Sequence, residues 1–266
     1  MNAQVNNNTP ALVLDNVTMR INGLTAVDRA SFSVPAGKIV SLIGPNGAGK
    51  TTTYNVISGY MKPTIGTVYF FGRDITGMAP EDISALGLVR SFQRTSVFSA
   101  CSVEENIMMA LHLKGGCGVF DSLFRTSRFR REEEKLRAEA QEIIAFLGLE
   151  ARKDDLATNL SYGEQRLLGV GLALAAKPRI LLLDEPAAGL NPSETEEFKE
   201  MVRRIGQRGV TVLLVEHDMH MVMSISDHIV VLNYGHVIAT GTPTEIQNNP
   251  EVIRAYLGSG IERAED

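Results

Sequence analysis

The stretch Gly44-Pro45-Asn46-Gly47-Ala48-Gly49-Lys50-Thr51 has the spacing G-x-x-x-x-G-K-T of a phosphate-binding loop. It follows the apolar residues 39–43 and precedes a segment of helical character, which predicts a strand, a glycine-rich loop and a helix. The glycines let the backbone curl so that successive N–H groups point at an anion. The start of the helix adds free N–H groups and the positive end of its dipole. This register therefore favours a phosphate site over a simple turn that carries a surface lysine.

The last two residues of the loop supply side chains that a bound nucleoside triphosphate requires. The Lys50 ammonium can lie between the β- and γ-phosphates, and the Thr51 hydroxyl can be a ligand of Mg²⁺. A second run, residues 180–186, reads Ile-Leu-Leu-Leu-Asp-Glu-Pro and predicts a buried parallel strand that ends at Asp184 and Glu185. Carboxylates at the C-terminal end of such a strand lie where ligands bind in open α/β sheets.

The composition is typical of a soluble globular protein with a sizeable core. Of 266 residues, 44% are hydrophobic and 21% are charged, and the formal net charge is −5, so bulk charge does not indicate nucleic-acid binding. The two cysteines, Cys101 and Cys117, lack metal-like spacing and suit a reducing compartment. The longest apolar run, residues 167–176, is about half as long as a bilayer requires. We therefore expect a cytoplasmic protein that reaches a membrane only through another polypeptide.

The middle of the chain, from residue 103 to about residue 176, predicts helices. One buried helical stripe is formed by Leu136, Ala140, Ile143, Ile144 and Leu147. Ser161, with Glu164 three residues later, is a capping box that begins the next helix. We expect the free N–H groups of that helix to be presented outward at Ser161 and Gly163, although this pattern alone indicates only a helix start.

Five elements now stand in one order along the chain. They are residues 44–51, Gln93, residues 160–165, residues 180–186 and His217. This order resembles the ATP-binding subunits of ABC transporters, whose elements are Walker A, Q-loop, signature, Walker B with its glutamate, D-loop and switch histidine. The resemblance covers residues 12–257 and disfavours a plain P-loop kinase or GTPase, in which a signature helix has no role.

The resemblance implies a role for each matching residue. Mg²⁺ would be held by Thr51, by Gln93 and, through water, by Asp184. Glu185 would be the general base that polarises the attacking water, His217 would clamp the γ-phosphate, and Gln93 and Lys50 would complete the catalytic set. ATP would be bound by Gly44, Pro45, Asn46, Gly47, Ala48, Gly49, Lys50, Thr51, Thr52 and Ile21, and from the opposite subunit of a head-to-tail dimer by Ser161, Gly163, Glu164 and Asn191.

The chain departs from the family pattern at two positions. Ile21 stands where the family usually stacks adenine on an aromatic side chain, and we expect weaker and less base-selective binding there. Asn191 stands in the D-loop where aspartate is common. Because asparagine can still cap the following helix and bond across the dimer, we expect function to survive this second change.

The expected fold is an α/β P-loop NTPase core, a mixed sheet flanked by helices, with an antiparallel β subdomain and an inserted α-helical subdomain. Short strands are expected over residues 11–14, 30–34 and 66–72, and a hairpin over residues 229–239. The resemblance implies a single domain over residues 11–258, between flexible tails 1–10 and 259–266. Its parts are a core of residues 11–95 and 177–245, a helical subdomain of residues 96–176 and a C-terminal helix of residues 246–258.

A finer resemblance links the chain to the Liv-type importers of branched-chain amino acids. It is carried by residues 160–166, 184–192, 216–219 and 249–258. Such a subunit works on the cytoplasmic face of the membrane with a second ATPase, identical or paralogous, two transmembrane permeases and, indirectly, a periplasmic binding protein. The alternatives are a urea or amide importer of the same subgroup and an ATPase for lipid or lipopolysaccharide export. A non-transport ABC ATPase acting on DNA or ribosomes is disfavoured by the single set of motifs and the lack of a basic face.

Overall fold

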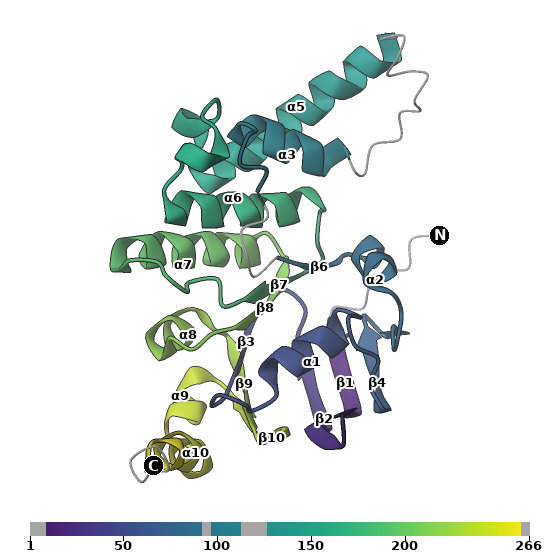
Figure 1. Cartoon of the computed structure of the whole chain (residues 1–266), viewed down its shortest axis with the longest axis vertical. Coiled ribbons are helices and arrows are strands. Elements are labelled where there is room, and N and C mark those ends of the chain that lie inside the picture. Colours follow the sequence, from purple (N-terminus) through teal and green to yellow (C-terminus); the bar gives the residue numbers. More distant parts are fainter. Residues whose placement is uncertain (1–8, 92–96, 113–126, 262–266) are drawn as a thin grey trace. The chain divides into compact units, whose positions relative to one another are not determined.

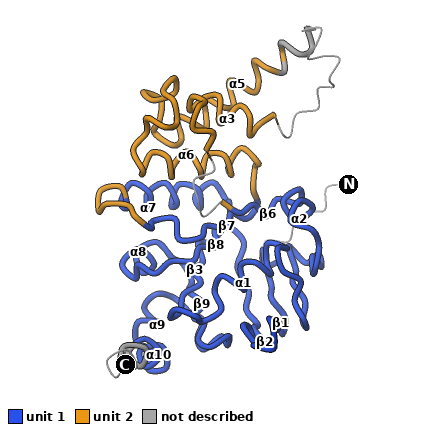
Figure 2. Tube along the Cα trace, viewed as in Figure 1, with its two compact units in different colours: residues 1–90, 179–188, 195–266 blue, residues 91–178, 189–194 orange. Residues whose placement is uncertain are grey.

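The structure is a computed structural model that describes residues 9–91, 97–112 and 127–261. Two compact units make up the chain (Figure 2). Unit 1 comprises residues 1–90, 179–188 and 195–266, and unit 2 comprises residues 91–178 and 189–194. The single domain over residues 11–258 stays a prediction.

In the described part of unit 1, one sheet has six strands in the order β10-β9-β3-β8-β7-β6. The strands are β3 (Ile39–Ile43), β6 (Leu88–Arg90), β7 (Ile180–Asp184), β8 (Thr211–Val215), β9 (His228–Asn233) and β10 (His236–Gly241). All neighbouring pairs are parallel except β9 and β10, which form the predicted antiparallel hairpin. Every residue of β3, β7 and β8 is buried, which explains why these strands read as continuous apolar runs. The mixed sheet is therefore confirmed.

The second sheet of unit 1 is antiparallel, with the order β2-β1-β4-β5 within the described ranges. Its strands are β1 (Leu12–Ile21), β2 (Leu24–Val34), β4 (Ile65–Phe70) and β5 (Arg73–Asp74). Strands are present at the positions predicted from residues 11–14 and 30–34, but their expected short length was wrong, because β1 and β2 have 10 and 11 residues. Register shifts interrupt their pairing, and Asn16 and Arg29 have positive φ angles. These bulges break the alternation of apolar and polar residues, so the pattern hides the rest of each strand.

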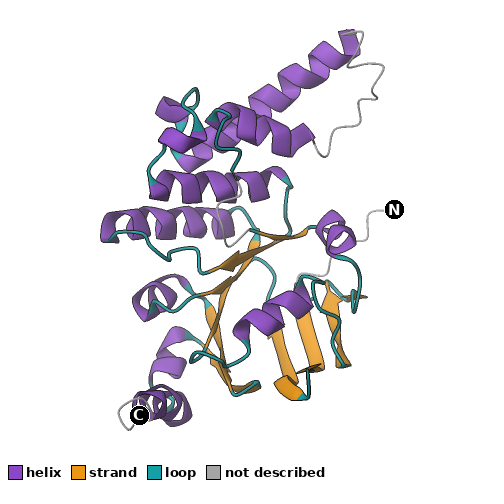
Figure 3. Cartoon of the chain, viewed as in Figure 1, coloured by secondary structure: helices purple, strands orange, loops and turns teal. Residues whose placement is uncertain are grey.

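Helices of unit 1 cover the sheets (Figures 1 and 3). They are α1 (Lys50–Ile57), α2 (Pro80–Leu86), α8 (Met219–Ile225), α9 (Pro243–Gln247), α10 (Pro250–Ile261) and residues 195–207 of α7 (Pro192–Gln207). The first of them, α1, lies between the two sheets, and its buried side chains join those of both sheets in one hydrophobic core. The buried apolar stripe of α7 is made by Phe198, Met201, Val202 and Ile205.

Tyr54 ties α1 to two strands of the six-stranded sheet. Its side chain is fully buried, and its hydroxyl donates to the carbonyl oxygens of Leu183, at 3.0 Å, and of Leu213. Burial raises the pKa of Tyr54 well above its ordinary value, and the charge of Asp184 adds to the effect. The hydroxyl therefore keeps its proton and fixes the helix that follows the glycine-rich loop against β7 and β8.

Unit 2 is helical in its described residues, as predicted. It contains α3 (Val103–His112), α5 (Ser127–Leu147) and α6 (Tyr162–Ala175), with two 3₁₀ turns, η1 (Glu150–Arg152) and η2 (Ala157–Asn159). Of the predicted stripe on α5, Ala140, Ile144 and Leu147 are buried and the other two residues are partly exposed. Gly171 of α6 permits close packing, because a β-carbon there would lie 2.5 Å from the Leu147 side chain.

Candidate nucleotide-binding site

The glycine-rich loop connects β3 to α1 in unit 1, as predicted. Gly44 has φ 152°, and a β-carbon at this position would lie 2.0 Å from the carbonyl oxygen of Leu232 in β9. The N–H of Gly235, in the turn between β9 and β10, donates to the carbonyl of Ala48 at 3.0 Å. The β9–β10 hairpin therefore supports the loop, and only glycine fits at its first position.

Lys50, the first residue of α1, is folded against its own loop. It is 6% exposed, and its Nζ donates to the carbonyl oxygens of Gly44, at 2.7 Å, and Pro45, at 2.9 Å. Burial lowers the pKa of Lys50, and the charge of Glu185 raises it in opposition. Gly49 caps α1 without a side-chain hydrogen bond, and the first turn of α1 contains no acidic residue. A buried cation beside a helix N-terminus that no side chain caps is a site that suits phosphate oxygens.

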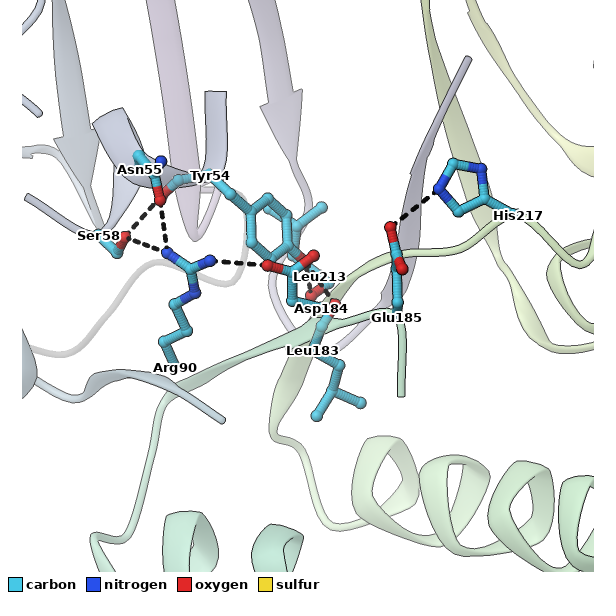
Figure 4. Close-up of polar contacts among 9 residues, drawn as sticks. All are labelled: Tyr54, Asn55, Ser58, Arg90, Leu183, Asp184, Glu185, Leu213 and His217. Atoms are coloured by element: carbon cyan, nitrogen blue, oxygen red, sulfur yellow. Dashed lines mark hydrogen bonds and ion pairs between the residues drawn. The ribbon is translucent and has the colours of Figure 1, made fainter. Parts of the chain in front are cut away.

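Asp184 ends β7 and is the most buried carboxylate of this region. Its side chain is 1% exposed, and its Oδ2 accepts a hydrogen bond from Nη2 of Arg90 at 2.7 Å (Figure 4). Its Oδ1 is buried and has no hydrogen-bond partner among the residues that the structure describes. A buried carboxylate oxygen without a donor fits a water bound to Mg²⁺, and the exposed Thr51 of α1 offers a hydroxyl ligand of the type that Mg²⁺ takes.

Glu185 and His217 are brought together, as the predicted roles require. Nε2 of His217 lies 2.9 Å from Oε1 of Glu185, and the side chains are 45% and 33% exposed (Figure 4). Glu185 has φ 46°, in the left-handed region, and its N–H donates to the carbonyl of Val215 at the end of β8. A non-glycine residue held in this conformation is common at functional sites. The backbone thus turns the carboxylate toward His217.

Glu216 is a site residue to which the sequence pattern assigned no role. It is 4% exposed, and its carboxylate accepts from the N–H groups of Ala187, at 2.8 Å, and His217, at 3.1 Å. Burial raises the pKa of Glu216, and these N–H donors lower it in opposition. The carboxylate fastens the segment after Glu185 to the segment that carries His217. Its only sequence signal is its place directly after a buried strand.

The signature segment begins α6 in unit 2 with the predicted capping box. The N–H of Glu164 donates to Oγ of Ser161 at 3.1 Å, and the N–H of Ser161 donates to Oε2 of Glu164 at 2.7 Å. Glu164 also forms an ion pair with Arg152, with 3.2 Å between Oε1 and Nε. Ser161 is exposed at the helix N-terminus, as expected.

The expectation that Gly163 is presented outward was wrong. Gly163 is buried, and a β-carbon there would lie 2.8 Å from the side chain of Glu194. Glu194 is held in place by Asn191, because each N–H donates to the other's side chain at 3.0 Å. Asn191 therefore caps α7, as predicted, and this cap places an acidic side chain over the second residue of the signature helix.

The roles of two further predicted site residues stay predictions. Ile21 is the last residue of β1, paired with Leu24 across a tight turn in which Asn22 and Gly23 have positive φ angles. Gln93 lies outside the described residues. Within the described ranges, every helix is too short or too polar to span a bilayer.

Comparison with known proteins agrees with this geometry. Residues 27–188 match the family model described as ABC transporter, and residues 236–262 match the one described as branched-chain amino acid ATP-binding cassette transporter. The high-affinity branched-chain amino acid transport ATP-binding protein LivG of Salmonella typhimurium is 44% identical over 250 residues, 94% of this chain and 98% of the relative. The corresponding protein BraF of Pseudomonas aeruginosa is 43% identical, with the same coverage.

Solved structures lead to the same family. An ATP-binding cassette of an ABC transporter in its ADP conformation matches with a TM-score of 0.81 and 32% identity, over 94% of this chain and 99% of that one. A nucleotide-free cassette matches with a TM-score of 0.80 and 33% identity, over 93% and 98% of the two chains. The chain belongs to the ABC transporter family as an ATP-binding, ATP-hydrolysing subunit of the branched-chain amino acid group.

Proposed function

We propose that this subunit binds MgATP at residues 44–52 and couples its hydrolysis to the import of branched-chain amino acids through partner permeases. The observation that carries the proposal is the convergence, within unit 1, of the phosphate loop, the buried Asp184 and the Glu185–His217 pair at the ends of β3, β7 and β8. The names of the relatives and the family match over residues 236–262 support the choice of cargo.

Hydrolysis at this site depends on positioning and charge, because the transferred phosphoryl group is nearly a free metaphosphate in the transition state. Lys50 exchanges its loop carbonyls for phosphate oxygens, and the N-terminus of α1 adds its N–H groups. Glu185 accepts a proton from the attacking water, while His217 holds the carboxylate and the γ-phosphate. Thr51, Gln93 and, through water, Asp184 would hold Mg²⁺, which would neutralise charge on the phosphates when bound.

A second ATP-binding subunit, either a copy of this chain or a paralogue, completes each site in the proposed head-to-tail dimer. The N-terminus of α6 is exposed at Ser161, and a helix N-terminus is suited to an anion. Ser161 and Glu164 already form the capping box of this helix within the chain. In the dimer, Ser161, Gly163, Glu164 and Asn191 act on the nucleotide of the opposite subunit. The Glu194 side chain lies beside Gly163, so the proposed dimer requires it to move aside for the partner's γ-phosphate.

The proposed assembly contains two transmembrane permeases and works with a periplasmic binding protein. This subunit docks on the permeases at the cytoplasmic face, contacts the membrane only through them and binds no nucleic acid. In the proposed assembly, the permeases and the binding protein determine which substrate is transported. A transport assay therefore requires the assembled complex.

The cargo is tested by purifying the complex that this chain forms with its permeases and reconstituting it in proteoliposomes with the binding protein. We expect ATP-dependent uptake of labelled leucine, isoleucine or valine. Uptake of urea or short amides alone would assign the complex to the related importers. Extraction of lipid or lipopolysaccharide from the membrane, with no uptake of amino acid, would contradict import.

The role of Glu185 is tested by Glu185→Gln, which keeps the size and the contact with His217 but removes the basic oxygen. Steady-state ATP hydrolysis should fall by roughly 10²–10³-fold while ATP binding is retained, because one transition-state group is lost. Glu200→Gln, on the exposed face of α7, is the matched control. Hydrolysis at the parental rate in Glu185→Gln would remove Glu185 from the mechanism.

The position of Ile21 predicts weak selection for adenine. Ile21→Phe should tighten ATP binding by about 1–3 kcal/mol, or roughly 5–150-fold, because an aromatic ring can stack on the base. The affinities of parent and variant for ATP and GTP, measured by titration calorimetry, give the comparison. If the parent already prefers ATP strongly and the variant gains nothing, another residue forms the adenine platform.

A further inference from the structure

The guanidinium of Arg90 occupies a central place between the phosphate-loop helix and the acidic end of β7 (Figure 4). Arg90 is the last residue of β6 and pairs with Leu182 of β7 in the parallel register. Its Nη2 donates to Oδ2 of Asp184 at 2.7 Å. Its Nη1 donates to Oδ1 of Asn55, at 2.8 Å, and lies 3.4 Å from Oγ of Ser58. Asn55 lies in α1, the helix that follows the phosphate loop, and Ser58 caps the C-terminal end of that helix.

The rings of two tyrosines confine the same guanidinium. Its central carbon lies 5.8 Å from the ring centroid of Tyr54 and 5.6 Å from that of Tyr60. The Arg90 side chain is 17% exposed, so these contacts are made largely away from water. A planar fork that donates in two directions and stacks on aromatic rings is particular to arginine, and a lysine ammonium reproduces only the charge.

We propose that Arg90 is a positioning residue for the metal-side carboxylate of the nucleotide site. It occupies Oδ2 of Asp184 and leaves Oδ1, which has no partner among the described residues, as the oxygen that receives the metal-bound water. This inference rests on the proposed MgATP site. Arg90 itself touches neither nucleotide nor metal.

The contacts of Arg90 also set the distance between α1, which carries Thr51, and the end of β7, which carries Asp184. Asn55 lies on α1 four residues after Thr51, about 6 Å along the helix axis, since each residue adds about 1.5 Å. Arg90 connects this point of α1 to Asp184, and Tyr54 connects the same turn to β7 and β8. The hydroxyl of Thr51 and the carboxylate of Asp184, which would share the metal, therefore lie on elements held at a fixed separation before the nucleotide binds.

The test is made on the full chain with Arg90→Gln and Arg90→Lys. ATP affinity is measured by calorimetry in EDTA and in Mg²⁺, and Mn²⁺ binding in the presence of ATP is followed by electron paramagnetic resonance. For Arg90→Gln we expect Mn²⁺ affinity to fall by about 10–100-fold, the usual effect of losing an outer partner of a metal ligand. ATP affinity in EDTA should stay within about twofold of the parent, and Arg90→Lys should lose less than Arg90→Gln.

Two controls separate positioning from general structure. Arg179→Gln removes a guanidinium that stacks over the Phe71 ring in the same unit, at 3.6 Å from the ring centroid, and should leave Mn²⁺ affinity unchanged. In an Asp184→Asn background, Arg90→Gln should add no further loss of Mn²⁺ affinity, because the carboxylate that it positions is gone.

Three results would overturn the inference. They are unchanged Mn²⁺ affinity in Arg90→Gln, an equal loss of ATP affinity with and without metal, and a further loss in the Asp184→Asn background. The first of these results, combined with a lower melting temperature of Arg90→Gln, would assign Arg90 a structural role alone. If the parent chain itself bound ATP no better with Mg²⁺ than in EDTA, the MgATP site would fail, which is a separate and recognisable outcome.

Discussion

The close approach of two backbones at Gly44 is the constraint on which the nucleotide site depends. No side chain larger than hydrogen fits between the start of the loop and the Leu232 carbonyl of β9. The Gly235 N–H, donated to Ala48, holds the loop a few residues later. The hairpin of β9 and β10, nearly two hundred residues away along the chain, therefore shapes the loop before any ligand is present. The contact between the loop and this hairpin therefore determines where Lys50 and the N-terminus of α1 lie.

Each buried charged side chain of this region has a hydrogen-bond or ion-pair partner. These partners determine what the site can bind. Lys50 is bound to two carbonyls, Asp184 to Arg90, and Glu216 to two backbone N–H groups. Burying a charge without a partner costs several kcal/mol of folding free energy. These contacts therefore hold the charged groups in place before the substrate binds. Phosphate oxygens can replace the carbonyls at Lys50. The remaining unsatisfied atom that the described residues show here, Oδ1 of Asp184, lies on the side chain that we propose holds the metal through water.

Local patterns predicted the parts of the site that are built from neighbours in sequence. The phosphate loop, the strand that ends at Asp184 and Glu185, and the caps at Ser161 and Asn191 depend on residues within a few positions of each other. The β bulges near Asn16 and Arg29 disrupt such a pattern, so the true lengths of β1 and β2 were missed.

Contacts between distant segments could not be predicted in this way. Arg90 meets Asp184 across 94 positions, and Tyr54 reaches Leu183 across 129. The burial of Gly163 follows from the side chain of Glu194, which no local spacing indicates. The order of the motifs along the chain was enough to identify the family. The side chains that hold the proposed catalytic residues in place could be identified only from the three-dimensional structure.

The central claim is that the N-terminus of α6 acts on a nucleotide bound by a second subunit, and Ser161 offers the most direct measurement. Ser161→Asp and Ser161→Asn both keep a good helix cap, but only the first adds a negative charge where we propose that phosphate binds. ATP hydrolysis is measured in the assembled pair of ATP-binding subunits, and ATP binding in the single chain. We expect that Ser161→Asp loses hydrolysis while binding ATP normally and that Ser161→Asn keeps most of its activity. Full hydrolysis by Ser161→Asp would contradict the central claim.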